Sequence, residues 1–195
     1  MLNENFVFVG IAITAIGLSS YFIDTVRGKI KPNKVSFALW SIAPIVTFFA
    51  QMKQGVGIQS LMTLSVGIFP IVIFLGSFVN KKAYWKITRF DLSCGTLALI
   101  GLLLWYITKV GNVAILFGIL ADGLAYVPTI TKAYKYPETE SAWPWFAAST
   151  NGLFTLLTIT TWNFANFSFP IYFLVINLIV FVVVQFKLGK IRPND

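Results

Sequence analysis

A single acidic residue stands inside one of the apolar runs of the chain. Asp122 lies near the middle of the segment Asn112–Ile130, where a charged side chain costs about 2.5–3.5 kcal/mol on membrane-insertion scales. The positions i−4, i−1 and i+3 from it hold Gly118, Ala121 and Ala125, and small residues of this kind form helix faces that pack against a neighbouring helix. The carboxyl group is therefore expected to point into the protein interior.

Two interpretations of Asp122 follow from this position. Low-dielectric surroundings favour the protonated form of a carboxyl group, which predicts a substrate ligand or a proton-coupling group. The alternative is a structural carboxyl group, hydrogen-bonded to a helix neighbour such as Tyr126, which lies one turn away.

Two amide side chains stand in otherwise apolar runs. Asn151 belongs to the run Ala142–Trp162, and Asn177 belongs to the run Phe169–Phe186. A buried amide must find hydrogen-bond partners. These are either a polar substrate in a pocket or groups on a neighbouring helix.

Aromatic side chains accompany these polar residues. Trp40 and Trp145 lie near the start of apolar runs, a depth that the amphipathic indole ring prefers. An alternative is that both form a lid over one side of a pocket, with Tyr126 as a further wall. Pro44 and Pro128 interrupt helical runs and free backbone carbonyl groups, which predicts hinge points.

The chain lacks the side chains on which most enzymes depend. It contains no His and a single cysteine, Cys94, so neither an intrachain disulfide nor a metal site is expected. Neither a phosphate-binding loop nor a nucleophile elbow is present. The sequence therefore predicts no enzyme, no catalytic residue, no metal and no cofactor.

Composition indicates lipid surroundings. Of the 195 residues, 57% are hydrophobic and only 11% are charged, against about 25% charged in a soluble domain. The net charge of +8 does not indicate nucleic acid, because nearly all of it lies in short loops between apolar runs. We therefore expect an integral, all-helical membrane protein whose partner is the lipid bilayer.

Seven runs have about the length that crosses the hydrocarbon layer. They are, approximately, Phe6–Ile23, Val35–Met52, Ile58–Val79, Leu92–Ile107, Asn112–Ile130, Ala142–Trp162 and Phe169–Phe186.

Basic residues gather on one side of these predicted helices. Thirteen of the fifteen fall on that side, namely Arg27, Lys29, Lys31, Lys34, Lys81, Lys82, Lys86, Arg89, Lys132, Lys135, Lys187, Lys190 and Arg192. The other side has only Lys53 and Lys109. Basic loops stay in the cytoplasm, so the N-terminus is expected outside and the C-terminus inside, in a membrane such as the bacterial inner membrane.

A sequence frame occurs twice. Pro-x-x-x-Ser-x-x-x-Trp spans Pro32–Trp40 and returns at Pro137–Trp145, shifted by 105 residues, and the same shift carries Tyr21 onto Tyr126. Such a repeat indicates a duplicated architecture. Residues 1–79 then form one triple-helix bundle, residues 80–110 a loop with a linker helix, and residues 111–195 a second bundle that the linker makes parallel to the first. Parallel repeats with a site between the halves are known among transporters.

This arrangement of three helices, a linker and three helices resembles the PQ-loop superfamily, which includes the SWEET sugar transporters and the KDEL receptor. A proline at the cytoplasmic end of a repeat's first helix adds to the resemblance. The Pro-Gln dipeptide itself is absent, because the second copy has Pro128-Thr129 and the first has Asp24-Thr25. The pattern looks most like that of bacterial members. The resemblance implies that Asn177 lies in the pocket, as an Asn on the last helix of a bundle does in the sugar transporters.

The expected function is a carrier, either a uniporter or proton-coupled, for a small polar solute such as a sugar, amino acid, nucleoside or vitamin. Asp122, Asn151 and Asn177 would contact the solute, with Tyr126, Trp40 and Trp145 as walls, Asp122 as the proton-coupling group, and Pro44 and Pro128 as hinges. The alternatives are a receptor or interaction protein that binds a ligand without moving it, and a scaffold without a cavity. A homo-oligomer of the chain is compatible with each of these.

Overall fold

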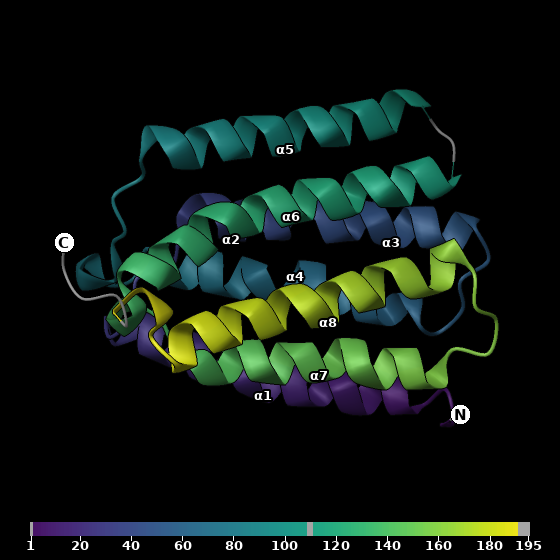
Figure 1. Cartoon of the computed structure of the whole chain (residues 1–195), viewed down its shortest axis with the longest axis horizontal. Coiled ribbons are helices and arrows are strands. Elements are labelled where there is room, and N and C mark those ends of the chain that lie inside the picture. Colours follow the sequence, from purple (N-terminus) through teal and green to yellow (C-terminus); the bar gives the residue numbers. More distant parts are fainter. Residues whose placement is uncertain (1, 109–110, 191–195) are drawn as a thin grey trace.

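The computed structural model describes residues 2–108 and 111–190 of the chain. Lys109 and Arg192, which the charge analysis assigns to opposite sides, lie outside the described residues. Helices, turns and loops make up the described part, with no strand among them (Figure 1). The α-helices are α1 (Phe6–Val26), α2 (Lys34–Trp40), α3 (Ala43–Lys53), α4 (Ser60–Gly76), α5 (Arg89–Thr108), α6 (Gly111–Lys135), α7 (Ala142–Thr158) and α8 (Phe164–Gln185).

Four helical stretches of the described chain are long and apolar enough to cross a membrane. They are α1, the α2–α3 pair taken together, α6 and α8, while α4 is an apolar helix of 17 residues. The prediction of an all-helical protein is confirmed. By length and composition, these four stretches indicate a membrane protein.

The distribution of side chains also fits lipid surroundings. Large apolar side chains lie exposed on the outside, for example Ile16 at 65% and Leu75 at 61% of their full accessible area. Some acidic and basic side chains lie inside, since Asp122, Lys132 and Glu140 are all buried. Soluble proteins rarely bury such charges or expose large apolar surfaces, so the outer surface is suited to lipid.

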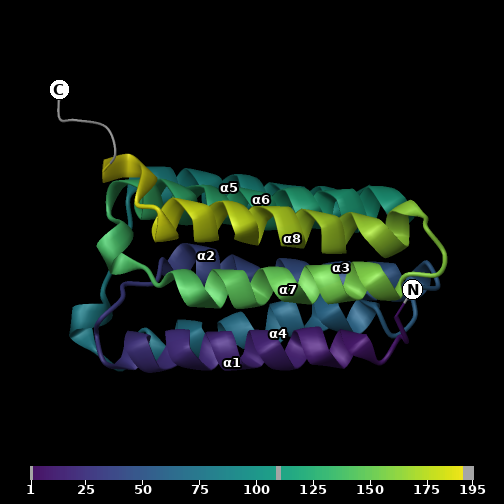
Figure 2. The same cartoon turned by 60° about the horizontal axis from the view of Figure 1, so that its bottom comes forward.

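Six helical stretches contact one another in a closed ring, and they run lengthwise beside one another (Figures 1 and 2). In this ring α1 packs on α4 and α7, and α4 packs on the α2–α3 pair, which packs in turn on α6; α8 then packs on both α6 and α7. The α5 helix lies outside the ring, against α6 and α2. The centre of the ring is thus enclosed by stretches from both ends of the chain.

The second apolar run is two helices instead of one. The chain turns at Ser41 and Ile42 between α2 and α3, and Pro44 lies in the first turn of α3. Proline has no N–H to donate to the carbonyl group four residues earlier, which here belongs to Trp40, so the break has a direct cause. Pro128 removes the same kind of bond inside α6, but α6 continues unbroken to Lys135.

Close contact between α1 and α7 depends on glycine. A Cβ atom on Gly17 would lie 2.5 Å from Ala147 Cβ, and one on Gly10 would lie 2.9 Å from the Cα of Asn151. Both distances are below normal van der Waals separations, so the two helices approach closely only because these positions lack side chains.

The connections that carry most basic residues lie at one end of the ring. This end, which we call the basic end, holds the α1–α2, α4–α5 and α6–α7 connections and the C-terminal end of α8, while the N-terminus lies at the opposite end (Figures 1 and 2).

Candidate functional site

A narrow cavity lies at the centre of the ring, with only about 40 Å³ of water-accessible space. Its walls come from α1, α2, α4, α6, α7 and α8. This space holds a few water molecules. The cavity is the candidate site because side chains from both halves of the chain converge on it.

The residues of the sequence repeat meet in this cavity. Tyr21, Trp40, Tyr126 and Trp145 all line it. The ring centroids of Trp40 and Tyr126 lie 4.4 Å apart, and those of Trp145 and Tyr21 lie 6.0 Å apart. The shift of 105 residues exchanges these two pairs. The two tryptophan rings also contact each other, 5.8 Å apart in an edge-to-face arrangement.

Four of the six solute-contacting residues expected from the sequence line the cavity. These four are Trp40, Tyr126, Trp145 and Asn177. Asp122 and Asn151 do not line it, although both side chains are completely buried.

Asp122 lies behind the aromatic wall. Its Oδ2 accepts a hydrogen bond of 2.7 Å from the hydroxyl group of Tyr172, while its Oδ1 has no partner among the described residues. The Tyr172 ring contacts the ring of Tyr126, with centroids 6.4 Å apart, and Trp40 Nε1 donates to the backbone carbonyl of Asp122 at 3.4 Å. Tyr172, and not Tyr126, is therefore the hydrogen-bond partner of the carboxyl group.

The two buried amides have different surroundings. Asn177 Oδ1 accepts from the hydroxyl group of Tyr126 at 3.2 Å, and its Nδ2 donates to the carbonyl of Phe173 at 2.8 Å. Asn151 Nδ2 reaches Ser65 Oγ at 3.4 Å, and its Oδ1 has no partner among the described residues. Asn177 thus belongs to the cavity wall, whereas Asn151 bridges α7 and α4.

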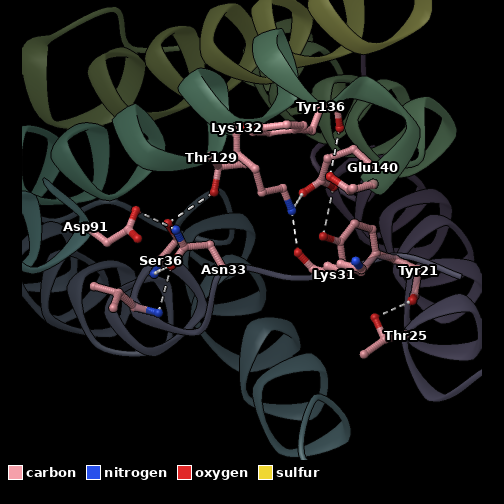
Figure 3. Close-up of polar contacts among 12 residues, drawn as sticks. Tyr21, Thr25, Lys31, Asn33, Ser36, Asp91, Thr129, Lys132, Tyr136 and Glu140 are labelled. Carbon is pink, nitrogen blue, oxygen red and sulfur yellow. Dashed lines mark hydrogen bonds and ion pairs between the residues drawn. The ribbon is translucent and has the colours of Figure 1, made fainter. Parts of the chain in front are cut away.

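A buried ion pair joins the end of α6 to the α6–α7 connection, at the basic end (Figure 3). Lys132 Nζ lies 2.5 Å from Glu140 Oε1, with both side chains almost completely buried. The other carboxylate oxygen of Glu140 accepts a hydrogen bond of 2.9 Å from the hydroxyl group of Tyr21, a cavity residue. Lys132 also donates to the carbonyl of Lys31. We call Lys132, Glu140 and Tyr21 the basic-end network.

Further hydrogen bonds join the two halves of the chain near the basic end. The amide of Lys31 donates to the carbonyl of Thr139 at 3.1 Å, which joins the α1–α2 connection to the α6–α7 connection. Ser36 Oγ donates to the carbonyl of Ala125 at 2.6 Å and accepts from Thr129 Oγ1 at 3.1 Å (Figure 3). The two copies of the repeated frame are thus bound to the opposite half of the chain.

Sequence reasoning missed three of these residues. Lys132 was counted among the loop cations, whereas it lies buried in the last turns of α6. Glu140 directly precedes the repeated Ser141, and an acid inside a repeated frame was an available clue. Nothing in the local pattern marked Tyr172, because an aromatic residue in an apolar helix is ordinary.

The arrangement suits reversible binding within an aromatic enclosure. Among the described residues, no group of three or more His, Cys, Asp or Glu side chains could hold a metal ion. Comparisons of the chain with protein-family models, with curated proteins and with solved structures found no match.

Proposed function

We propose that the protein is a membrane carrier of a small polar solute, working by alternating access. The observation that carries the proposal is the central cavity, to which both copies of the repeat contribute a tyrosine and a tryptophan. A carrier needs one site that can open to either side of the membrane. A cavity between two similar halves can do so if the halves rock against each other.

The helix contacts support a plan of three helices, a linker and three helices. In the first half α4 packs between α1 and the α2–α3 pair, and in the second half α8 packs between α6 and α7. Across the halves, the contact of α1 with α7 corresponds to the contact of α6 with the α2–α3 pair. A pseudo-twofold axis through the cavity would relate these contacts, as in the SWEET-like plan, with α5 as the linker.

In this proposal the chain crosses the membrane seven times, with α4, α5 and α7 as the further spans. The 20 residues of α5 would extend about 30 Å, the thickness of the hydrocarbon layer. The 17 residues of α4 and of α7 would extend about 26 Å. The basic end faces the cytoplasm, and the bacterial inner membrane is the proposed location.

Opening towards the cytoplasm would separate the basic-end network. The ion pair of Lys132 with Glu140 lies within the second half. The hydrogen bonds from Tyr21 to Glu140 and from Lys132 to the carbonyl of Lys31 bind it to the first half. Pro44, at the break between α2 and α3, and Pro128 in α6 would allow the halves to bend. Asp122 is one tyrosine removed from the cavity wall, a position from which protonation would affect the wall through Tyr172.

The experiment has two stages. A thermal-stabilisation screen of the purified protein with sugars, amino acids, nucleosides and vitamins identifies a bound solute. Vesicles that contain the protein are then preloaded with that solute, and entry of the labelled form is measured. A carrier exchanges labelled for unlabelled solute faster than vesicles without protein. Binding without exchange would contradict the proposal and favour the receptor alternative.

A further inference from the structure

The wall of the central cavity is aromatic and uncharged. None of the described residues that line it is an acid or a base. Six of them carry aromatic rings, namely Tyr21, Phe37, Trp40, Tyr126, Trp145 and Phe173. Flat faces and edges of rings therefore supply much of the surface that a solute would touch.

Most polar groups of this wall already have partners. The hydroxyl groups of Tyr21 and Tyr126 donate to Glu140 and Asn177 at 2.9 and 3.2 Å. Asn177 uses one of its two amide N–H groups to donate to the carbonyl of Phe173.

The two remaining polar groups of the wall, apart from Trp145, are also engaged. Thr14 Oγ1 donates to the carbonyl of Ala147 at 3.3 Å, and Trp40 Nε1 donates to the carbonyl of Asp122 at 3.4 Å. A solute that sought hydrogen-bond donors from these groups would have to break existing bonds.

Trp145 is the exception. Its side chain lines the cavity and is only 6% exposed, yet its Nε1–H has no partner among the described residues. The indole N–H is a donor and never an acceptor. A buried donor without a partner costs more than a typical hydrogen bond gains, so an acceptor on a bound molecule would relieve that cost.

The polar groups and aromatic rings of the wall favour some small solutes over others. A sugar brings several hydroxyl groups, and the wall offers their oxygens only two unengaged N–H donors, on Trp145 and Asn177. Most of these oxygens would therefore lose their water without compensation. An amino acid brings two opposite charges, which the uncharged wall leaves uncompensated. A planar ring loses little on entering a narrow aromatic cavity and gains stacking or edge contacts with the ring walls.

We infer that the cavity, once it widens, takes an uncharged, planar heteroaromatic solute whose ring nitrogen or carbonyl oxygen accepts a hydrogen bond from Trp145 Nε1–H. The inference rests on the proposed function and narrows it from small polar solutes to this chemical class.

Two bicyclic probes of similar size test the inference by calorimetric titration of the detergent-solubilised protein. Quinoline carries a ring-nitrogen acceptor, while indole carries an N–H donor and no comparable acceptor; the pH is chosen so that quinoline is uncharged. We expect quinoline to bind about tenfold more tightly than indole, and glucose not to compete with it. Equal binding of quinoline and indole, or tighter binding of glucose, would overturn the inference.

The variant Trp145→Phe removes the donor and keeps a ring. It should weaken quinoline binding about tenfold and leave indole binding nearly unchanged. Trp162→Phe is the matched control, because Trp162 is 58% exposed and lies outside the cavity, and it should bind both probes as the wild type does. Quinoline binding that survives Trp145→Phe unchanged would overturn the assignment of the donor. The wild-type comparison of the two probes remains decisive if the variant does not fold.

Failure of the inference and failure of the proposed function give different results. Counterflow of a sugar, with no quinoline binding, would support the proposed carrier function and overturn the inferred class of solute. Selective quinoline binding without counterflow of any heteroaromatic solute would support the class of ligand and contradict transport.

Discussion

Asp122 has one carboxylate oxygen bonded to Tyr172 and the other without a partner among the described residues. A buried acid in this condition is suited to binding and releasing a proton. Since the carboxyl group does not line the cavity, its effect on a solute would pass through Tyr172 and Tyr126.

Replacing Asp122 by Asn keeps the size of the side chain and removes its titratable group. If Asp122 couples protons, Asp122→Asn abolishes proton-driven uptake into vesicles with a pH gradient and leaves counterflow without a gradient largely intact. Tyr172→Phe, which keeps the acid and removes its donor, should shift the pH dependence of uptake instead. Unchanged uptake with unchanged pH dependence in Asp122→Asn would remove this residue from the mechanism.

The basic-end network gives a second prediction at this scale. Removing one member of a buried ion pair leaves an uncompensated charge and costs about 3–5 kcal/mol, so Lys132→Met and Glu140→Gln should each lower the thermal unfolding midpoint strongly. The double variant should recover part of the loss, since it leaves neither charge alone.

Lys190→Met is the control for this series, because Lys190 and Glu138 form an exposed ion pair of 2.9 Å. Exposed pairs contribute little, so this variant should melt close to the wild type. Equal thermal unfolding midpoints of Lys132→Met and Lys190→Met would show that the buried ion pair does not stabilise the basic end.

At the residue scale, the sequence predicted the members of the cavity wall better than their partners. Trp40 and Trp145 were recognisable through the repeated frame, and Asn177 through its isolation in an apolar helix. The bonds of Asp122 to Tyr172 and of Lys132 to Glu140 join helices that are distant in the sequence, and no local pattern encodes which helices become neighbours.

At the scale of elements, the approach of α1 to α7 limits the size of the side chains between them. Gly17 lies against Ala147 and Pro144 of α7, so any larger side chain must push the two helices apart. Overpacking of this kind costs about 1–3 kcal/mol.

Gly17→Leu should therefore lower the thermal unfolding midpoint and the yield of folded protein in detergent. Ile16→Leu is the control, because Ile16 is 65% exposed on the lipid-facing side of the same helix. A melting midpoint of Gly17→Leu equal to that of Ile16→Leu would contradict the tight α1–α7 contact.

The apolar runs predicted the ends of the helices to within about five residues. They did not predict the break between α2 and α3. The run Val35–Met52 was expected as a single helix, and the structure divides it into α2 and α3. Pro44 was recognised as an interruption. Whether a proline breaks a helix or is absorbed, as Pro128 is in α6, depends on packing around the freed carbonyl group and is not encoded in the run itself.

At the scale of the whole molecule, the ring of helices encloses polar and aromatic residues and presents apolar side chains outward. Composition alone predicted this inversion. The repeat predicted that equivalent residues of two halves would meet, because a duplicated unit that pairs with its copy brings equivalent positions near a common axis. The volume and closure of the cavity, by contrast, depend on side-chain packing that the sequence does not reveal.

The central claim is that one cavity opens alternately to both sides of the membrane, and a single cysteine tests it without knowledge of the solute. Cys94, the only native cysteine, lies buried on α5 and is first replaced by Ala. Ala148, which lines the cavity, is then replaced by Cys, with the cysteine-free protein as the control.

A small membrane-impermeant thiol reagent is applied to oriented vesicles from either side in turn. We expect Cys at position 148 to be modified from both sides. Cross-linked cysteines at positions 31 and 139, which lie side by side in opposite halves, should abolish modification from the basic end only. Modification from one side alone, or from neither, would contradict alternating access.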